Sequence, residues 1–130
     1  MLVKFESTRF INTDNVSFIS IYNYGFEFTL MMDENVITIN SFDCISKEEL
    51  ALLFENNENF LKVIVDKNKN VVYINIKAVT RVEVEETQLS FNFVNDNNPF
   101  FVFDSSADKI IKEFNERLEE LKSKNYVDHF

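Results

Sequence analysis

Alternating apolar and polar residues predict short β-strands along most of the chain. The clearest case is residues 26–32, where Glu27 and Thr29 stand on one face and the opposite face is apolar. Residues 89–93 repeat this alternation. The stretch 100–103 is apolar on both faces, which predicts a central strand that is buried on both sides.

Two stretches change from the period of a strand to that of a helix. In the first, Ser46 and Glu49 have the spacing of a capping box at the start of a helix. Leu50, Leu53 and Phe54 then form an apolar stripe, so this helix is expected to cover a core.

The second helical stretch covers about residues 106–124, and the tail 125–130 shows no periodicity. Its apolar stripe consists of Ile110, Ile111, Phe114, Leu118 and Leu121. From Ile111 onwards the steps are three, four and three residues, the seam spacing of a coiled coil. We therefore expect Leu118 and Leu121 to lie near the edge of the core and to mediate a weak homodimer. A helix that packs along the whole sheet is the alternative.

A shift of 63 positions aligns residues 9–35 with residues 72–98. Apolar positions, turn residues and a following helix then occur in the same order, which is typical of an internal repeat. The identical pairs are Ile11 and Ile74, Asn12 and Asn75, Val16 and Val79, Phe28 and Phe91, Asp33 and Asp96, and Asn35 and Asn98. Two unrelated meanders would also share alternation and polar turns, so coincidence stays open as the alternative.

These patterns predict an α+β fold in a single domain, residues 1–130. We expect two tandem repeats, each an antiparallel β-meander followed by a helix, that share one core. Repeat 1 is residues 1–59, repeat 2 is residues 60–124, and residues 125–130 form a tail. The alternative is a single seven-stranded barrel of the PH-like type with a C-terminal helix, in which residues 46–54 are an insertion.

The composition bears on the turns and on the location of the protein. The hydrophobic fraction of 45% suffices for a core. Because Gly25 is the single glycine and there are seventeen asparagines, Asn is expected to serve most turns, as at residues 12–15. The single cysteine, Cys44, cannot form an internal disulfide, and the first ten residues lack the apolar run of a signal peptide. With no window that approaches a membrane span, a cytoplasmic protein without membrane contact is predicted.

The residues with reactive side chains do not assemble into a catalytic motif. The one histidine, His129, is the second-to-last residue, so Cys44 and the hydroxyls have no evident base. There is no Cys/His pair, no calcium-loop spacing and no Gly-rich phosphate loop, so no metal and no cofactor are expected. The carboxylates of Glu83 and Glu85 fit a solvated strand face. An enzyme that uses carboxylates alone stays open as a further class.

The charge of the chain makes nucleic acid an unfavourable partner. The formal net charge is −9, from 22 acidic and 13 basic residues, and such a surface repels phosphate backbones and anionic lipids. The alternative function is that of a regulator that stacks the bases of single-stranded RNA on an aromatic sheet face. Its basic contacts would be Lys67, Lys69, Lys77 and Arg81.

One short string has a resemblance outside the chain. Residues 73–75, Tyr-Ile-Asn, followed by Val79, Val82 and Glu83, resemble the start of small bacterial β-meander proteins of the flagellar FlbD-like type. Those proteins usually carry a proline after the asparagine, where this chain has Thr13 and Ile76. The resemblance therefore implies no function or site residue.

The sequence thus favours a non-enzymatic regulatory or accessory protein that acts through contacts with an unidentified protein partner. The acidic charge is compatible with this class. The abundance of Asn, Lys, Ile and Phe indicates an AT-rich genome, so the expected source is a mobile element or phage of a low-GC bacterium.

Overall fold

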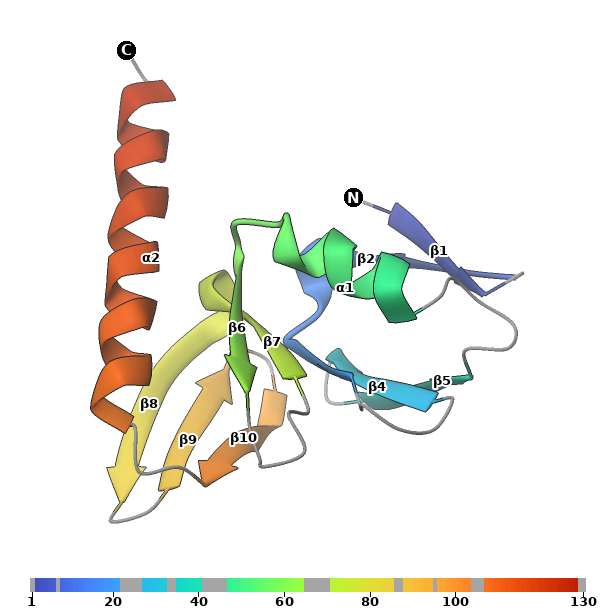
Figure 1. Ribbon diagram of the computed structural model, residues 1–130, viewed down its shortest axis with the longest axis horizontal. Helices are drawn as coiled ribbons and strands as arrows, with labels where there is room; N and C mark the ends of the chain where they lie inside the picture. The colour runs from blue at the N-terminus through green and yellow to red at the C-terminus, as the bar shows by residue number, and fades with distance from the viewer. Residues whose placement is uncertain are drawn as a thin grey trace.

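The computed structural model describes residues 2–6, 8–21, 27–32, 35–40, 47–64, 71–85, 88–94, 96–103 and 107–128. These residues form ten β-strands in three sheets and two α-helices (Figure 1), which confirms the predicted α+β class. The strands are β1 (Leu2–Glu6), β2 (Arg9–Asn12), β3 (Phe18–Ile21), β4 (Glu27–Met32), β5 (Asn35–Asn40), β6 (Phe60–Ile64), β7 (Val71–Asn75), β8 (Val79–Glu85), β9 (Gln88–Phe93) and β10 (Asp96–Phe103). The helices are α1 (Lys47–Glu55) and α2 (Ala107–Asp128).

The strands pair across the two halves of the chain. The largest sheet has the order β5-β4-β3-β7-β6, so a meander from the first half is extended by a hairpin from the second. The second sheet has the order β10-β9-β8, and β1 pairs with β2 alone. All the described pairings are antiparallel, and the three sheets are open, so the described strands do not close a barrel.

The elements occur in the same order before and after the joint at residues 56–59. Within its described residues, each half has two strands, a short 3₁₀ helix, three strands and an α-helix. The two 3₁₀ helices, η1 (Thr13–Asn15) and η3 (Ile76–Ala78), are 63 positions apart. Asn12 caps η1 by accepting from the backbone NH of Asp14 at 3.2 Å, which confirms the capped turn predicted there.

The buried apolar side chains form two clusters. The first cluster consists of Phe5, Ile11, Val16, Ile19, Ile21, Leu50, Phe54, Phe60 and Tyr73. The second cluster consists of Leu61, Val63, Val72, Ile74, Ile76, Leu89, Phe91, Phe93, Ile110 and Leu121. The core predicted from the sequence as one body is therefore divided, among the described residues, into two.

The largest sheet lies between the two clusters. The Cα partners Ile19 and Tyr73 belong to the first cluster, whereas Phe18 and Ile74, the next pair along, contact the second. Side chains alternate across a strand, so β3 and β7 are covered on both faces. The strand β10, which was expected to be central, lies at the edge of its sheet in the described part of the chain. The prediction of a central β10 is therefore wrong for its sheet. The strand covered on both faces is instead β7, which is also rich in apolar residues.

Each helix covers one cluster. Leu50 and Phe54 of α1 are buried in the first cluster, and Ile110 and Leu121 of α2 are buried in the second, as their stripes predict. The helix α2 continues to Asp128, so the predicted tail is helical through most of its length. Neither glycine nor proline occurs there to end the helix. The predicted hairpin at Gly25, the cap Ser46, and Cys44 and His129 lie outside the described residues.

Candidate interaction site

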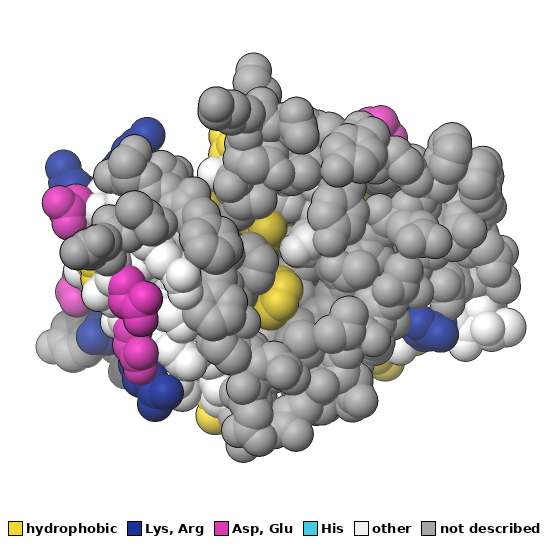
Figure 2. All heavy atoms as spheres, turned by 90° about the horizontal axis from the view of Figure 1, so that it is seen from below, with side chains coloured by type: hydrophobic (Ala, Val, Ile, Leu, Met, Phe, Trp, Pro, Cys, Tyr) yellow, Lys and Arg dark blue, Asp and Glu magenta, His cyan; other side chains and the backbone are white. Residues whose placement is uncertain are grey.

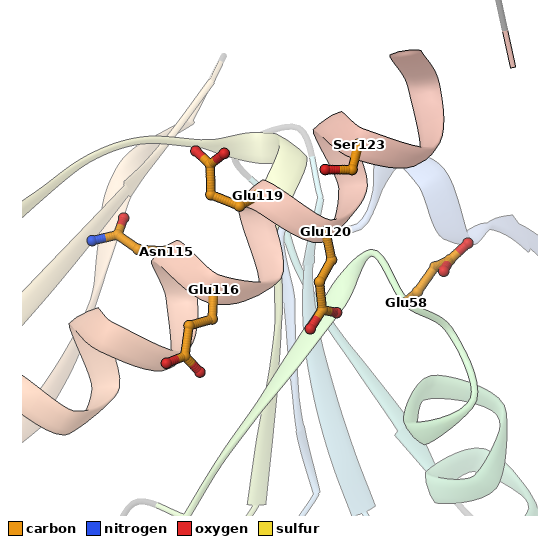
Figure 3. A pocket seen from close by; sticks show the side chains of 6 residues that line it. All are labelled: Glu58, Asn115, Glu116, Glu119, Glu120 and Ser123. Carbon is orange, nitrogen blue, oxygen red and sulfur yellow. The ribbon is translucent and has the colours of Figure 1, made fainter. Parts of the chain in front are cut away.

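An open acidic groove lies where α2 passes the joint between α1 and β6 (Figure 3). Its volume is about 810 Å³. The residues that line it are Glu58, Asn115, Glu116, Glu119, Glu120 and Ser123. We call this feature the acidic groove.

The helical period places five of these residues on the outer side of α2. Phe114 and Leu121 of the same helix pack on the second cluster. The five groove residues lie a quarter to half a turn away from that side of the helix, and all five are exposed. In Figure 3, Glu116 and Glu120 project to one side of α2 and Glu119 to the other. The carboxylates are therefore spread along the groove and do not converge on one point. Among the described residues, no group of three or more His, Cys, Asp or Glu side chains could hold a metal ion.

Arg117 fixes the position of the groove. Its Nη1 donates to the backbone carbonyls of Glu58 at 3.3 Å and of Phe60 at 3.2 Å, which ties α2 to the joint. Its Nε lies 3.7 Å from Oε2 of Glu120. The guanidinium is thus held by groups of the protein itself, and Glu116 and Glu119 of the groove are exposed to solvent.

The electrostatics of the groove favour a cationic ligand. Four carboxylates lie along it, and Lys122 contributes one exposed ion pair, with Nζ at 3.9 Å from Glu119 Oε1. Such an exposed pair stabilises little and is readily exchanged. Glu120 is paired with Arg117, so the four carboxylates and the two cations leave an excess of negative charge at the groove, which favours cationic over anionic groups.

A second group of polar side chains lies at the surface beside the first cluster, where exposed Glu55 and Lys62 meet the buried Tyr73. The hydroxyl of Tyr73 donates to Oε2 of Glu55 at 3.3 Å, and Nζ of Lys62 lies 3.4 Å from Oε1 of the same residue. Burial raises the pKa of Tyr73 to about 12, and the charge of Glu55 and its hydrogen bond to the hydroxyl act in the same direction. The phenol stays protonated at neutral pH, so it serves as a structural donor.

The basic positions predicted for nucleic acid are only partly placed. Lys77 on η3 and Arg81 on β8 are exposed, and Lys67 and Lys69 lie outside the described residues. Arg81 Nε is 2.7 Å from Oε1 of Glu83, so its charge is partly neutralised. Figure 2 shows described side chains of both signs next to each other at the end of the molecule where Figure 1 places α2, β8 and β9.

The sheet aromatics are mostly used for packing. Tyr73, Phe91 and Phe93 are buried, so the described face of the β9 sheet is not a stacking platform. Phe10 on β2 is an exception, because its side chain is exposed and lies opposite Lys4 in the β1–β2 register.

The predicted self-association residues point inward. Leu121 is buried in the second cluster, and Leu118 is half-buried against the same cluster. The homodimer stays a prediction. Its two leucines offer less free surface than the spacing alone indicates, because the protein's own core uses them.

The acidic groove was not recognised from the sequence. The spacing of Glu116 and Glu120, four residues apart, places these two on one side of the helix. Glu58, however, comes from the joint, and only the tertiary arrangement brings it to α2.

Comparison with known proteins adds no relative. No protein-family model matches the chain, and no curated protein matches its sequence. The resemblance to FlbD-like proteins is therefore not supported by a family match. Neither α1 nor α2, as far as the structure describes them, has the length and apolar character needed to cross a membrane.

Proposed function

We propose that this protein is a non-enzymatic regulatory or accessory protein that acts by binding another protein, and that the acidic groove receives a basic segment of that partner. The observation that supports the proposal is the groove itself. Four carboxylates from α2 and the joint line one open concavity, and Arg117 beside it is bonded internally. An enclosed pocket would favour a small ligand, whereas an open groove along a helix suits a protein segment.

The charge pattern gives this binding mode a measurable signature. Complementary charges chiefly accelerate association and select the partner, and their effect decreases as salt screens them. Binding through the groove is therefore expected to weaken between low and physiological salt.

The test is capture of the partner from an extract of the native host by three immobilised proteins. These are the wild type, the groove variant Glu116→Gln/Glu119→Gln and a control variant Glu48→Gln/Glu85→Gln. The control removes the same charge from exposed positions on α1 and β8. We expect a basic partner that the wild type and the control retain and that the groove variant loses by about tenfold or more. A partner retained equally by all three proteins would contradict the proposal.

The second candidate is a regulator that binds single-stranded RNA, and Phe10 is the observation in its favour. The exposed ring of Phe10, opposite Lys4 on the β1–β2 ribbon, has the character of a base-stacking site. Lys77 and Arg81 would add phosphate contacts from the second half. Fluorescence anisotropy with a labelled RNA oligonucleotide at several salt concentrations tests it. Binding that is lost in Phe10→Ala and falls with salt would replace the protein-partner proposal.

We also propose that the chain is one domain made of two copies of a single unit, within the cytoplasm of a low-GC bacterium or its phage. The equal order of elements supports the duplication, and so do the equivalent caps Asn12 and Asn75. Across the hairpins, Lys4 is opposite Phe10, and Lys62 is opposite Tyr73 in the same register. An experimental structure whose halves do not superpose would contradict this.

A further inference from the structure

If the halves are equivalent, the pairing of β3 with β7 in the largest sheet has no counterpart among the described residues. The shift of 63 positions relates β3 to β8 and β2 to β7. In the largest sheet, β3 pairs with β7. Within the described residues, no ladder joins β8 to β2, so each of these strands has one edge without a neighbouring strand.

Three apolar positions mark the same difference. At each position, the residue in or next to the β3–β7 pairing is buried, and the equivalent residue of the other half is exposed. The pairs are Phe60 at 3% and Leu2 at 67%, Tyr73 at 2% and Phe10 at 61%, and Ile21 at 8% and Val84 at 56% exposure. The exposed members are carried by β1, β2 and β8. Phe60 and Tyr73 are covered by Phe54 of α1, whereas Phe10 and Val84 lie on strands that have one edge without a neighbouring strand among the described residues.

The register of the existing pair predicts the register of the missing one. The Cα partners of β3 and β7 include Ser20 with Val72 and Ile21 with Val71. The shift converts these pairs to Glu83 with Arg9 and Val84 with Thr8. A carboxylate on β8 then stands opposite a guanidinium on β2, which is a favourable cross-strand pair.

The partner strand cannot come from the same chain without unpacking it. The ribbon of β1 and β2 is anchored by Phe5 and Ile11, which are buried in the first cluster. The turn that follows β2 is held by Nδ2 of Asn75, which donates to the carbonyls of Asp14 and Val16. These contacts fix the direction of β2, whereas a second copy can present its β2 as a rigid body.

We propose that two copies of this chain dimerise by pairing β2 of each copy, antiparallel, with β8 of the other. The arrangement has twofold symmetry, so it closes with both edges used in both copies. It gives the open edges of β2 and β8 a neighbouring strand and places one beside the exposed side chains of Phe10 and Val84. The inference rests on the proposed equivalence of the halves and does not involve the acidic groove.

A charge exchange tests the pairing by sedimentation velocity. Arg9→Glu and Glu83→Arg each place two like-charge contacts in the dimer, so each is expected to weaken association by roughly tenfold. An equimolar mixture of the two variants forms a heterodimer in which both contacts are again of opposite charge. We expect the mixture to regain the affinity of the wild type. Leu52→Glu, at an exposed apolar position on α1, is the control and should leave the dimer unchanged.

Disulfide cross-linking distinguishes the second copy from other occupants of the β8 edge. In a Cys44→Ser background, Thr8→Cys and Val84→Cys on separate chains are expected to cross-link when mixed. The equivalent pair Ile21→Cys/Val71→Cys, whose Cα atoms are register partners, should cross-link within one chain. A monomeric wild type at every concentration, or the absence of a Thr8–Val84 cross-link between the mixed chains, would overturn the proposal. Loss of groove binding alone would leave it intact.

Discussion

At the scale of single residues, Asn75 joins the two halves of the molecule. Its Nδ2 donates to the carbonyls of Asp14 at 3.2 Å and Val16 at 3.0 Å, while its Oδ1 accepts from the NH of Lys77 at 3.1 Å. The side chain is buried, so both ends of the amide have to be satisfied. A carboxylate at this position would face two carbonyl oxygens, which explains why an amide is used.

The variant Asn75→Ala is therefore expected to lower the free energy of unfolding by about 1–3 kcal/mol, because it removes the hydrogen bonds to the buried carbonyl of Val16, the carbonyl of Asp14 and the NH of Lys77. Asn12→Ala removes the equivalent cap at a half-buried position and is expected to lower it by about 1 kcal/mol. Urea unfolding followed by circular dichroism measures both. Equal losses in the two variants would show that the contacts between the halves contribute nothing beyond the local cap.

Tyr73 is expected to make the stability depend on pH in the alkaline range. The pKa of its hydroxyl is raised from 10.0 in the unfolded chain to about 12, chiefly by burial. Between these values the folded protein keeps the proton and the unfolded chain loses it, so stability is full below pH 10 and falls as the pH rises towards 12. Tyr73→Phe removes this dependence and the hydrogen bond, at a cost of about 1 kcal/mol at pH 7. Urea midpoints at pH 8, 10 and 11 check it; parallel curves for both proteins would contradict the assignment.

At the scale of elements, the local features were predictable from the sequence. The alternation of residues 89–93 placed Leu89, Phe91 and Phe93 on one buried face, and the stripe of α1 placed Leu50 and Phe54 in a core. The turn at Asn12 follows from its own side chain. Each of these features depends on residues close in sequence, so the period and the capping chemistry are sufficient.

The features that the sequence did not predict depend on contacts between distant elements. An apolar run predicts a buried strand but does not choose its neighbours, so the run of β10 predicts a central strand, whereas β10 lies at the edge of its sheet in the described part of the chain. The acidic groove needs Glu58 of the joint next to the acidic residues of α2. Helical spacing predicts the arrangement of the residues on α2 but not the position of Glu58. The inward position of Leu121 follows from how far α2 extends along the second cluster.

At the scale of the whole molecule, the halves are interlocked through the first cluster and the largest sheet. Phe60 and Tyr73 come from the second half but pack against Phe54 of α1, with ring centroids 4.8 Å and 5.9 Å from it. The pairing of β3 with β7 adds main-chain hydrogen bonds between the halves. Separation would expose these rings and leave β7 with one neighbour, so the first cluster is complete only when both halves are present.

This arrangement predicts that fragments 1–57 and 58–130 do not fold alone. The first fragment would lack Phe60 and Tyr73 in its cluster. The second fragment would expose these two rings and would lose β3 from beside β7, the strand that contributes Val72 and Ile74 to the second cluster. We expect each isolated fragment to give the dispersion of an unfolded chain in proton NMR spectra, and an equimolar mixture to recover the spectrum of the intact protein. The control is the intact chain with a protease site inserted between residues 57 and 58, which should stay folded after cleavage. Two fragments that fold separately and do not associate would contradict the interlocked core.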